Sequence, residues 1–459
     1  MFYALNPDYR ICGYRGLPYL LYHRVVGSLS VLSKDDADLI GTCDGSTDMP
    51  LTDSIKRLCS LNILKGSPEP IPVSESQRYV YYDNRYFRTV TWAVTSACNL
   101  NCRHCFAAKD ANRTADRFTL EEAKKLIGEL KACGVHEVDL TGGEPLMHPE
   151  LDKIIEELSR SDIKIGRIVT NGLLVTDTFL KRLKELKVDP LFTVSFDGLG
   201  THDWLRNAEG IEQKTLDQID RIVGAGFDVS VQMCVYRGNT DRMWDTLKYF
   251  ETRGISSMRF MRASEAPRWA EQYLDQTLTF EEYYDAGLKL TERYAAEGGT
   301  LNFRVWRMLQ YTYQEGHILI RPMHNTGPCS GKWTACQDAH DNFFIGASGE
   351  AAPCMPVSGF LMMKGISMGN VKKDPLQKIL SESKLTDWTL LKLEDIYRVN
   401  AKCRECPYRD ACCGGCRALA YGLSGDLCGT DPMRCAYFFG GFSDRLNELV
   451  KKYTKEPDA

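Results

Sequence analysis

Cysteine is the residue type whose number and spacing point most directly to chemistry in this chain of 459 residues. Of its 18 cysteines, three lie at Cys98, Cys102 and Cys105, and ten fall between Cys329 and Cys435. Small secreted domains use cysteines as disulfides, whereas clustered thiols in a large protein without a secretion signal are more often metal ligands or catalytic groups. The clustering therefore predicts metal–thiolate chemistry at two places in the sequence.

The first cysteine group follows an apolar run, TVTWAVT at 89–95, and has the spacing C-x3-C-x2-C. A closed structural zinc site has four protein ligands, and this loop offers three. A cluster of four irons held by three thiolates keeps one iron free to bind another molecule, which fits the loop better. A zinc site that borrows a further ligand, such as His104 or Cys133, is the alternative.

This loop resembles that of the radical S-adenosylmethionine (SAM) enzymes, since an aromatic residue, His104, precedes the last cysteine. The sequence DLTGGEP at 139–145 resembles the GGE motif with which that family binds the methionine amine of SAM. The resemblance implies a [4Fe-4S] cluster on Cys98, Cys102 and Cys105 and SAM contacts from His104, Gly142, Gly143 and Glu144. It also implies the reaction: an electron from the cluster breaks the sulfonium–carbon bond of SAM, and the resulting 5′-deoxyadenosyl radical abstracts a hydrogen from an unactivated C–H position.

Polar residues end three further apolar runs, in VTNG (169–172), VSFDG (194–198) and VQMCV (231–235). Functional residues of βα barrels cluster at the C-terminal ends of the strands. Similar enzymes use a Ser of the fourth strand and a following Arg for the ribose and carboxylate of SAM. The predicted further SAM contacts are thus Asn171, Ser195, Arg206 and Gln232. The catalytic residue is not identified, and Asp197, Arg259, Arg262 and Glu265 are candidate substrate contacts.

The second cysteine group has a longer signature. Twelve residues separate Cys336 from Gly349, four more precede Cys354, and C-x2-C-x5-C-x3-C runs from Cys403 to Cys416, with Cys435 nineteen residues on. This arrangement resembles the SPASM domain, the auxiliary-cluster module of peptide- and protein-modifying radical enzymes. It implies one auxiliary cluster on Cys329, Cys336, Cys354 and Cys416, a second on Cys403, Cys406, Cys412 and Cys435, and three [4Fe-4S] clusters in all. Cys413 or Cys428 could replace a neighbour, and a pair of four-cysteine zinc sites is the alternative.

Short apolar runs alternate with amphipathic segments from Val90 onward, which predicts parallel strands joined by helices. The strands are expected at 90–94, 137–140, 164–169, 191–195, 229–235 and 257–261, and the helices near 119–133, 149–161, 176–187, 213–224 and 242–253. Six such units are too few for a closed barrel of about 250 residues. The expected fold class is therefore α/β, a partial (β/α)6 radical SAM barrel. We expect a recognition-like domain at 1–85, the barrel at 86–278, a helical bridge at 279–325, the Cys-rich SPASM domain at 326–440 and a C-terminal helix or tail at 441–459.

The first 85 residues contain strand-like runs at 18–32 and short helical segments at 34–45 and 51–64. This order, around TCDG at 42–45, resembles the winged-helix-like peptide-recognition domain of modified-peptide biosynthesis. In that family a leader peptide adds to the small sheet as an extra strand. A nucleic-acid-binding winged helix would need a basic surface, but residues 1–88 carry ten Lys/Arg and ten Asp/Glu. A purely structural cap on the barrel is the other alternative.

The whole chain has a formal charge of −4 and lacks both a signal core and an apolar run of the ~18–20 residues that a membrane helix needs. These features predict a cytoplasmic protein that binds neither nucleic acid nor membranes. We expect a radical SAM/SPASM peptide maturase that installs a thioether or C–C crosslink in a ribosomally made precursor peptide carrying a leader segment. Its reductant would be a flavodoxin or ferredoxin.

Three alternatives remain. The first is an anaerobic sulfatase-maturating enzyme, although that family typically has an Asp where Met355 follows Cys354 here. The second is a radical SAM enzyme that acts on a tetrapyrrole or other small molecule. The third is a non-enzymatic iron–sulfur electron carrier, which the three-cysteine loop and the GGEP sequence disfavour.

Overall fold

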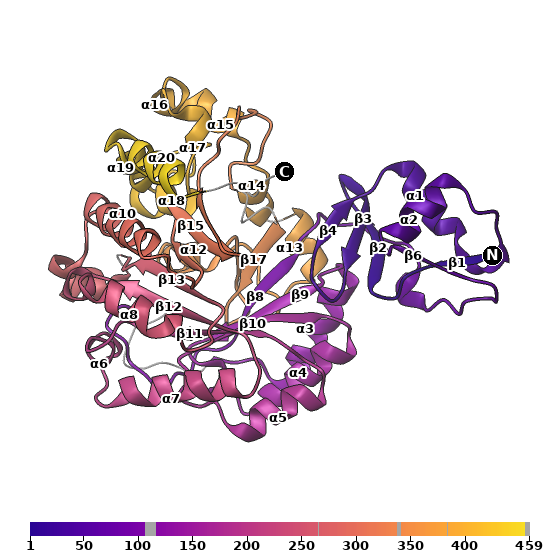
Figure 1. Ribbon diagram of the computed structural model, residues 1–459, viewed down its shortest axis with the longest axis horizontal. Coiled ribbons are helices and arrows are strands. Elements are labelled where there is room, and N and C mark those ends of the chain that lie inside the picture. Colours follow the sequence, from indigo (N-terminus) through magenta and orange to yellow (C-terminus); the bar gives the residue numbers. More distant parts are fainter. Residues whose placement is uncertain (106–115, 265, 337–340, 383, 455–459) are drawn as a thin grey trace.

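The computed structural model describes residues 1–105, 116–264, 266–336, 341–382 and 384–454, so the candidate Glu265 lies outside the described residues. Within these ranges the centre of the molecule is one large sheet with the strand order β16-β15-β14-β13-β12-β11-β10-β9-β8-β17-β18 (Figure 1). Every neighbouring pair from β17 through β8 to β14 is parallel. This is the mixed α/β architecture with a large parallel sheet that the sequence predicts.

All six predicted strands are present: β8 (Thr89–Thr95), β9 (Glu137–Gly142), β10 (Lys164–Thr170), β11 (Leu191–Ser195), β12 (Val229–Val235) and β13 (Ser257–Arg262). The helices between them are α3 (Leu120–Ala132), α4 (Leu151–Arg160), α5 (Asp177–Glu185), α6 (His202–Arg206), α7 (Ile211–Gly224) and α8 (Arg242–Glu251). Short 3-10 turns, η2 (Pro145–Met147) and η3 (Arg237–Asn239), follow β9 and β12. The period-2 and period-3.6 patterns predict these elements correctly because both reflect burial on one face.

The expected helical bridge at 279–325 is wrong over its second half. After α9 (Pro267–Gln272), η4 (Leu274–Gln276) and α10 (Phe280–Ala296), the chain forms β14 (Phe303–Val305), β15 (Leu309–Gln314) and β16 (His317–Pro322). Strand β14 pairs with β13 in parallel, and β15 and β16 form a hairpin. Glu315 and Gly316 both have positive φ, as a two-residue hairpin turn requires, so the Glu-Gly pair between alternating apolar residues was the available signal.

The sheet presents two different faces. In β12, Val229, Val231, Met233 and Val235 are buried in the main apolar core, while Ser230, Gln232 and Cys234 between them are partly exposed. Side chains alternate across a strand, so the apolar set packs against the surrounding helices and the polar set lines the inner face. The inner face is therefore available to ligands.

The N-terminal unit lies at one side of the sheet (Figure 1) and contains two small sheets, β5-β1-β6 and β4-β3-β2-β7. Its elements are β1 (Phe2–Leu5), β2 (Tyr9–Tyr14), β3 (Leu17–His23), β4 (Leu29–Val31), α1 (Lys34–Thr42), β5 (Asp44–Asp48), α2 (Asp53–Ser60), β6 (Leu64–Ser67), η1 (Glu75–Gln77) and β7 (Val80–Tyr82). The strands followed by short helices are as expected. The sequence did not predict the sheet formed by β1, β5 and β6. Its strands are short, and only β1 is mostly buried.

The C-terminal region is built mainly of short helices. Strand β17 (Asn342–Ile345) pairs with β8, and β18 (Ala351–Ala352) pairs with β17. The helices are α12 (Met355–Met363), α13 (Leu376–Glu382), α14 (Lys384–Leu390), α15 (Leu393–Val399), α16 (Ala401–Arg404), α17 (Arg409–Cys412), α18 (Arg417–Ser424), α19 (Pro432–Phe439) and α20 (Phe442–Tyr453). Across the described ranges, we find no helix that combines the length and apolarity needed to span a membrane.

Candidate active site

The three-cysteine loop begins where β8 ends, at the C-terminal edge of the parallel sheet. Cys102 is buried in a small cluster with Leu100 and Ile211, and Cys98 and Cys105 pack against the same cluster. The Cys98 sulfur accepts a hydrogen bond from the Leu100 N–H at 3.5 Å. The fold therefore gathers the three predicted ligands in one partly apolar loop.

Gly142 and Gly143 allow the end of β9 to approach this loop closely. The Gly143 and Glu144 N–H groups donate to the carbonyls of Thr95 and Ala97, both at 2.8 Å. A Cβ atom on Gly142 would lie 2.3 Å from the Thr95 carbonyl oxygen, and one on Gly143 would lie 2.4 Å from that of Ala97. Any larger residue would push the cysteine loop away from β9, so both glycines are needed for the loop position itself.

The Glu144 carboxylate is held by protein donors at the ends of β9 and β10, and its contact with the SAM amine stays a prediction. It is fully buried and accepts hydrogen bonds from the Thr170 hydroxyl and the Asn171 N–H, both at 2.8 Å, and from the Leu146 N–H at 3.2 Å. Burial raises the pKa of this carboxyl, while these donors oppose the rise. Glu144 thus joins the ends of β9 and β10.

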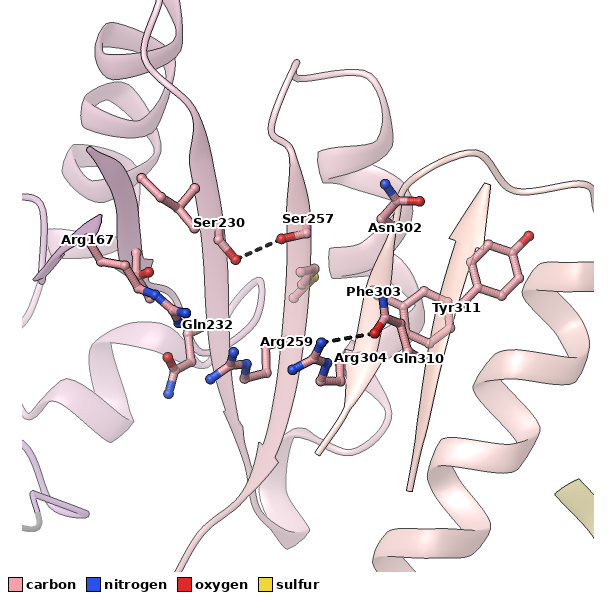
Figure 2. Close-up of a pocket in the computed structure, with 13 residues that line it drawn as sticks. Arg167, Ser230, Gln232, Ser257, Arg259, Asn302, Phe303, Arg304, Gln310 and Tyr311 are labelled. Carbon is pink, nitrogen blue, oxygen red and sulfur yellow. Dashed lines mark hydrogen bonds between the residues drawn. The ribbon is translucent and has the colours of Figure 1, made fainter. Parts of the chain in front are cut away.

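The other predicted SAM contacts divide into two groups. The Asn171 side chain donates to Asn99 Oδ1 in the cysteine loop at 2.7 Å, so it belongs to the loop's support. Ser195 ends β11 and is in register with Gln232 of β12. Gln232 donates to the Met261 sulfur at 2.7 Å and lines a cavity in the sheet's inner face (Figure 2). The role of Asn99 was missed, because no sequence pattern relates residues 72 positions apart.

Arg206, the predicted contact of the SAM carboxylate, lies beside Asp197 and the cysteine loop. Its Nε donates to Asp197 Oδ2 at 2.6 Å, and its Nη1 lies 3.8 Å from the Cys102 sulfur. Although burial opposes ionisation of Asp197, the adjacent Arg206 guanidinium holds the pKa of this carboxyl well below its usual range. The other Asp197 oxygen accepts from the Cys234 N–H at 3.0 Å. The pair is a buried ion pair beside a predicted cluster ligand.

His104 supplies a test of whether the site fits a cofactor. Its Nδ1 atom is buried and has no hydrogen-bond partner among the described residues. Burial lowers its pKa to about 4, with the Arg206 charge adding to the effect. An unpartnered buried nitrogen beside three thiols, with a glycine pair next to them, fits the predicted cluster and SAM.

The four cysteines predicted for the second auxiliary cluster lie close enough to influence one another. Burial raises the pKa of the Cys403 thiol, and Cys435 and Cys406 add to the rise. Burial likewise raises the pKa of Cys412 to about 12, with contributions from Cys435 and Cys403. Cys403, Cys412 and Cys435 therefore lie in one region of the fold, and the cluster assigned to them stays a prediction.

The ligand set predicted for the first auxiliary cluster is less uniform. Cys413 Sγ lies 3.0 Å from Cys329 Sγ, so the open question about Cys413 concerns this cluster. Cys416 is supported by Asp431, whose Oδ2 accepts from the Cys416 N–H at 2.7 Å and also pairs with Arg307. In the parts of the chain that are described, no three His, Cys, Asp or Glu side chains converge on a single metal ion.

Comparison with known proteins agrees with this geometry. Residues 92–250 match the Radical SAM superfamily, and residues 336–407 match an iron-sulfur cluster-binding domain, SPASM. The chain is 27% identical to an AdoMet-dependent heme synthase of Methanosarcina barkeri, over 76% of this chain and 96% of that protein. It is 23% identical to a PqqA peptide cyclase of Granulibacter bethesdensis, over 74% of this chain and 84% of that protein.

The fold also resembles a solved structure. The crystal structure of Streptococcus suis SuiB bound to precursor peptide SuiA has a TM-score of 0.63 and 15% identity, and the match covers 91% of this chain and 96% of that one. The two matched domains lie at the two cysteine groups and carry iron–sulfur chemistry, which sets aside the zinc alternatives and the simple electron carrier. The chain is therefore an enzyme of the Radical SAM superfamily that carries a SPASM domain.

Proposed function

We propose that this enzyme is a peptide maturase that cleaves SAM reductively and installs a thioether or C–C crosslink in a ribosomally made precursor peptide. The observation that carries the proposal is the N-terminal unit, a small β-sheet domain attached to the barrel, whose edge strand β4 pairs on one side only within the described parts of the chain. The match to SuiB covers 91% of this chain. Residues 1–85 are about a fifth of the chain, so a match of this extent reaches into them and supports a counterpart in a peptide-bound structure.

One edge strand of the sheet β4-β3-β2-β7 is β4, which pairs only with β3 among the described residues. Its partner β3 pairs with it through Leu20↔Val31, Leu21↔Ser30 and Tyr22↔Leu29. On either side of these pairs, β3 and β4 are joined by backbone hydrogen bonds. The Leu32 N–H donates to the Tyr19 carbonyl, and the His23 N–H donates to the Ser28 carbonyl. Because antiparallel pairs alternate, Leu29 and Val31 direct their N–H and C=O groups outward. An extended leader peptide would add to β4 through these groups.

The N-terminal unit is anchored at the start of the barrel strands. Asp162, just before β10, accepts hydrogen bonds from Arg10 and, at 2.6 Å, from Arg24. Lys164 Nζ donates to the Val25 carbonyl at 3.1 Å, between β3 and β4. The contacts of Arg24 and Val25 come from the loop that leads into β4, so they fix the position of this strand relative to the barrel.

We propose three [4Fe-4S] clusters at the predicted sites, with SAM bound beside the first. A bound SAM cluster would supply the electron for cleavage of the sulfonium–carbon bond. Cys98, Cys102 and Cys105 would hold it, the Gly142–Gly143 backbone would leave room for SAM, and Arg206 places a positive charge beside Cys102. Two fully ligated auxiliary clusters would suit electron transfer better than substrate binding. A flavodoxin or ferredoxin in the cytoplasm would be the reductant.

A second candidate is a tetrapyrrole-modifying enzyme, which the similarity to the heme synthase over 96% of its length favours. That match covers 76% of this chain, an extent that does not require residues 1–85. A sulfatase-maturating activity is disfavoured because Met355, rather than an acid, follows Cys354.

The test is anaerobic co-expression of this protein with short peptides encoded next to it, followed by intact-mass analysis. A crosslinking maturase removes two hydrogens per bond formed, and a Cys98→Ala variant should leave the peptide mass unchanged. Unmodified peptides from an enzyme that still releases methionine and 5′-deoxyadenosine would contradict the peptide proposal.

A further inference from the structure

A buried ion pair joins the barrel to the C-terminal region beside Cys416, a cysteine predicted for the first auxiliary cluster. Arg307 lies in the turn between β14 and β15, and Asp431 directly precedes α19. The Arg307 side chain is 11% exposed and that of Asp431 is 1% exposed. Because β14 is parallel to β13, this turn lies at the C-terminal edge of the parallel sheet, where the cysteine loop also begins.

The Asp431 carboxylate holds both the Cys416 backbone and the start of α19. Its Oδ2 accepts a hydrogen bond from the Cys416 N–H at 2.7 Å. Its Oδ1 accepts from the N–H groups of Met433 and Arg434 at 3.0 and 3.2 Å, which makes Asp431 the N-cap of this helix. Helix α19 carries Cys435, a predicted ligand of the second auxiliary cluster. One carboxylate therefore fixes the backbone next to both predicted ligand sets.

The contact between Asp431 and Cys416 requires the glycine that precedes the cysteine. Gly415 has a φ of +70°, and a Cβ atom on it would lie 2.6 Å from Asp431 Oδ2. Any larger residue would be strained and would also push the carboxylate away from the Cys416 N–H. The backbone before Cys416 is thus shaped to receive a buried carboxylate.

Arg307 has a backbone conformation that favours glycine. Its φ is +62°, in the left-handed region that non-glycine residues seldom adopt. The Arg434 side chain donates to the Arg307 carbonyl at 3.0 Å and so holds the turn in place. Unfavourable conformations of this kind persist where the surrounding structure fixes them, and they gather at functional sites. The turn therefore accepts backbone strain at a position whose distinguishing feature is its charged side chain.

The Arg307 guanidinium offers a positive charge and a hydrogen-bond donor beside Cys416. It shares Asp431 Oδ2 with the Cys416 N–H. Its Nε is buried and has no hydrogen-bond partner among the described residues. Although burial opposes the charge, Asp431 and then Cys416 raise the pKa of Arg307 above its usual range. A buried donor next to a thiol fits an iron–sulfur cluster, because hydrogen bonds to the sulfurs and nearby charges set its potential.

The same arrangement occurs at the cysteine loop. There Arg206 donates to Asp197 and lies 3.8 Å from the Cys102 sulfur. At both places a buried aspartate holds an arginine next to a predicted cluster ligand. The two pairs come from different parts of the chain, so each is built independently by the fold.

A reduced cluster carries one more negative charge than the oxidised cluster, so a nearby cation stabilises the reduced form. We propose that Arg307 and Asp431 are positioning residues of the auxiliary cluster at Cys416. Asp431 fixes the Cys416 backbone, and the charge of Arg307 raises the reduction potential of this cluster. Resting on the proposed function, which assigns a cluster to Cys416, this charge makes the cluster a better electron acceptor.

The experiment measures reduction potentials in the iron-loaded full-length protein with Cys98, Cys102 and Cys105 replaced by Ala, so that only auxiliary clusters remain. Anaerobic titration with titanium(III) citrate is followed by electron paramagnetic resonance. The transition that disappears in a further Cys416→Ala variant belongs to the cluster at Cys416. Iron content and a cooperative thermal transition verify that each variant is folded.

Asp431→Asn should raise the potential of this transition, because the arginine charge remains without its carboxylate. Arg307→Gln should lower it, because the carboxylate remains alone, and the Arg307→Gln/Asp431→Asn double variant should lie between the two. A unit charge within about 10 Å changes the ratio of reduced to oxidised cluster by at least about tenfold at an effective dielectric constant of about 20. Arg445→Gln, which breaks an exposed ion pair with Asp285, should leave the potential unchanged.

Opposite shifts in the two single variants support the proposal, since a merely structural disturbance would not give them opposite signs. Shifts of the same sign, or no shift, overturn it, as does a Cys416→Ala variant that keeps every transition. If Arg307→Gln does not retain the cluster, Asp431→Asn alone decides by the sign of its shift, because its amide oxygen can still accept from the Cys416 N–H. None of these readouts depends on peptide modification, which the co-expression experiment tests separately.

Discussion

Arg206 Nη1 lies 3.8 Å from Cys102 Sγ, while the same guanidinium donates its Nε–H to Asp197. A cation at this distance stabilises the thiolate form of a cysteine, which is the form that binds iron. The carboxylate of Asp197 holds the cation in place. The predicted cluster ligand is therefore supported from the fourth strand and the helix that follows it, not from its own loop alone.

The Asp197–Arg206 pair should contribute strongly to stability. Removal of one partner of a buried ion pair costs about 3–5 kcal/mol because it leaves the other charge unpaired. We expect Asp197→Asn to lower the unfolding temperature markedly in anaerobic calorimetry, with part of the loss recovered in the Asp197→Asn/Arg206→Gln double variant. Asp245→Asn on the exposed face of α8 is the matched control. Equal unfolding temperatures for Asp197→Asn and Asp245→Asn would refute the assignment.

Replacement of Glu144 by Gln tests whether this residue is a support or a direct SAM contact. The carboxylate accepts hydrogen bonds from three protein donors, and an amide would place one N–H against a donor. An unsatisfied buried group costs about 1–3 kcal/mol, so the variant should lose stability even without SAM. Glu121→Gln on exposed α3 provides the comparison. If Glu144→Gln weakens SAM binding and leaves the unfolding temperature of the SAM-free protein unchanged, the residue contacts SAM instead.

Loss of the three loop cysteines should remove one of the three proposed clusters. We expect the Cys98→Ala/Cys102→Ala/Cys105→Ala variant to contain about a third less iron than the reconstituted enzyme, on the count of three four-iron clusters. It should release no methionine from SAM. Iron analysis and product chromatography measure the two effects. SAM cleavage by the triple variant would show that the cofactor site lies elsewhere.

The junction between the N-terminal unit and the barrel should weaken in acid. His136 is buried against Tyr14, whose hydroxyl lies 3.0 Å from its Nε2, and burial, assisted by Arg10, lowers its pKa to about 3. An unfolded His takes up a proton near pH 6.5, whereas the folded residue stays neutral until about pH 3. The stability that depends on neutral His136 is therefore fully present above pH 6.5. As the pH falls below this value, the free energy of unfolding decreases by about 1.4 kcal/mol per pH unit for one proton.

Unfolding curves between pH 7 and pH 5 measure this dependence. His136→Gln should flatten it, whereas His317→Gln, at an exposed position of β16, should leave it unchanged. A pH slope that is the same in His136→Gln and in the unmodified protein would count against the buried neutral histidine.

Leader binding should depend on the outward-facing backbone of β4. Proline lacks an N–H, and an edge strand tolerates it where the N–H faces solvent. Val31→Pro should therefore keep the fold and weaken binding of the precursor peptide, because it removes an outward donor. The Val31 side chain is 73% exposed, so Val31→Ala is the control for its loss. Calorimetric titration with the peptide identified by co-expression measures the affinity of both variants for it. Equal affinities of the proline and alanine variants would exclude β4 as the docking edge.

The sequence by itself determined the chemistry of this protein and the elements that carry it. Cysteine spacing identified both iron–sulfur regions, and apolar periodicity placed the six central strands within one or two residues. These features are local, since ligand spacing in a loop and burial on one face both act over a few residues along the chain. The Glu-Gly turn and short strands after α10 carry weaker local signals and were missed.

Only the tertiary structure decided what several of these residues do. The fold surrounds Glu144 with the donors of Thr170 and Asn171 and pairs Arg206 with Asp197. The pairing of Arg259 with Arg304 arises from strand register across the sheet, and the approach of Cys413 to Cys329 joins residues 84 positions apart. Such contacts depend on how distant segments pack in three dimensions, which the order of residues along the chain does not reveal.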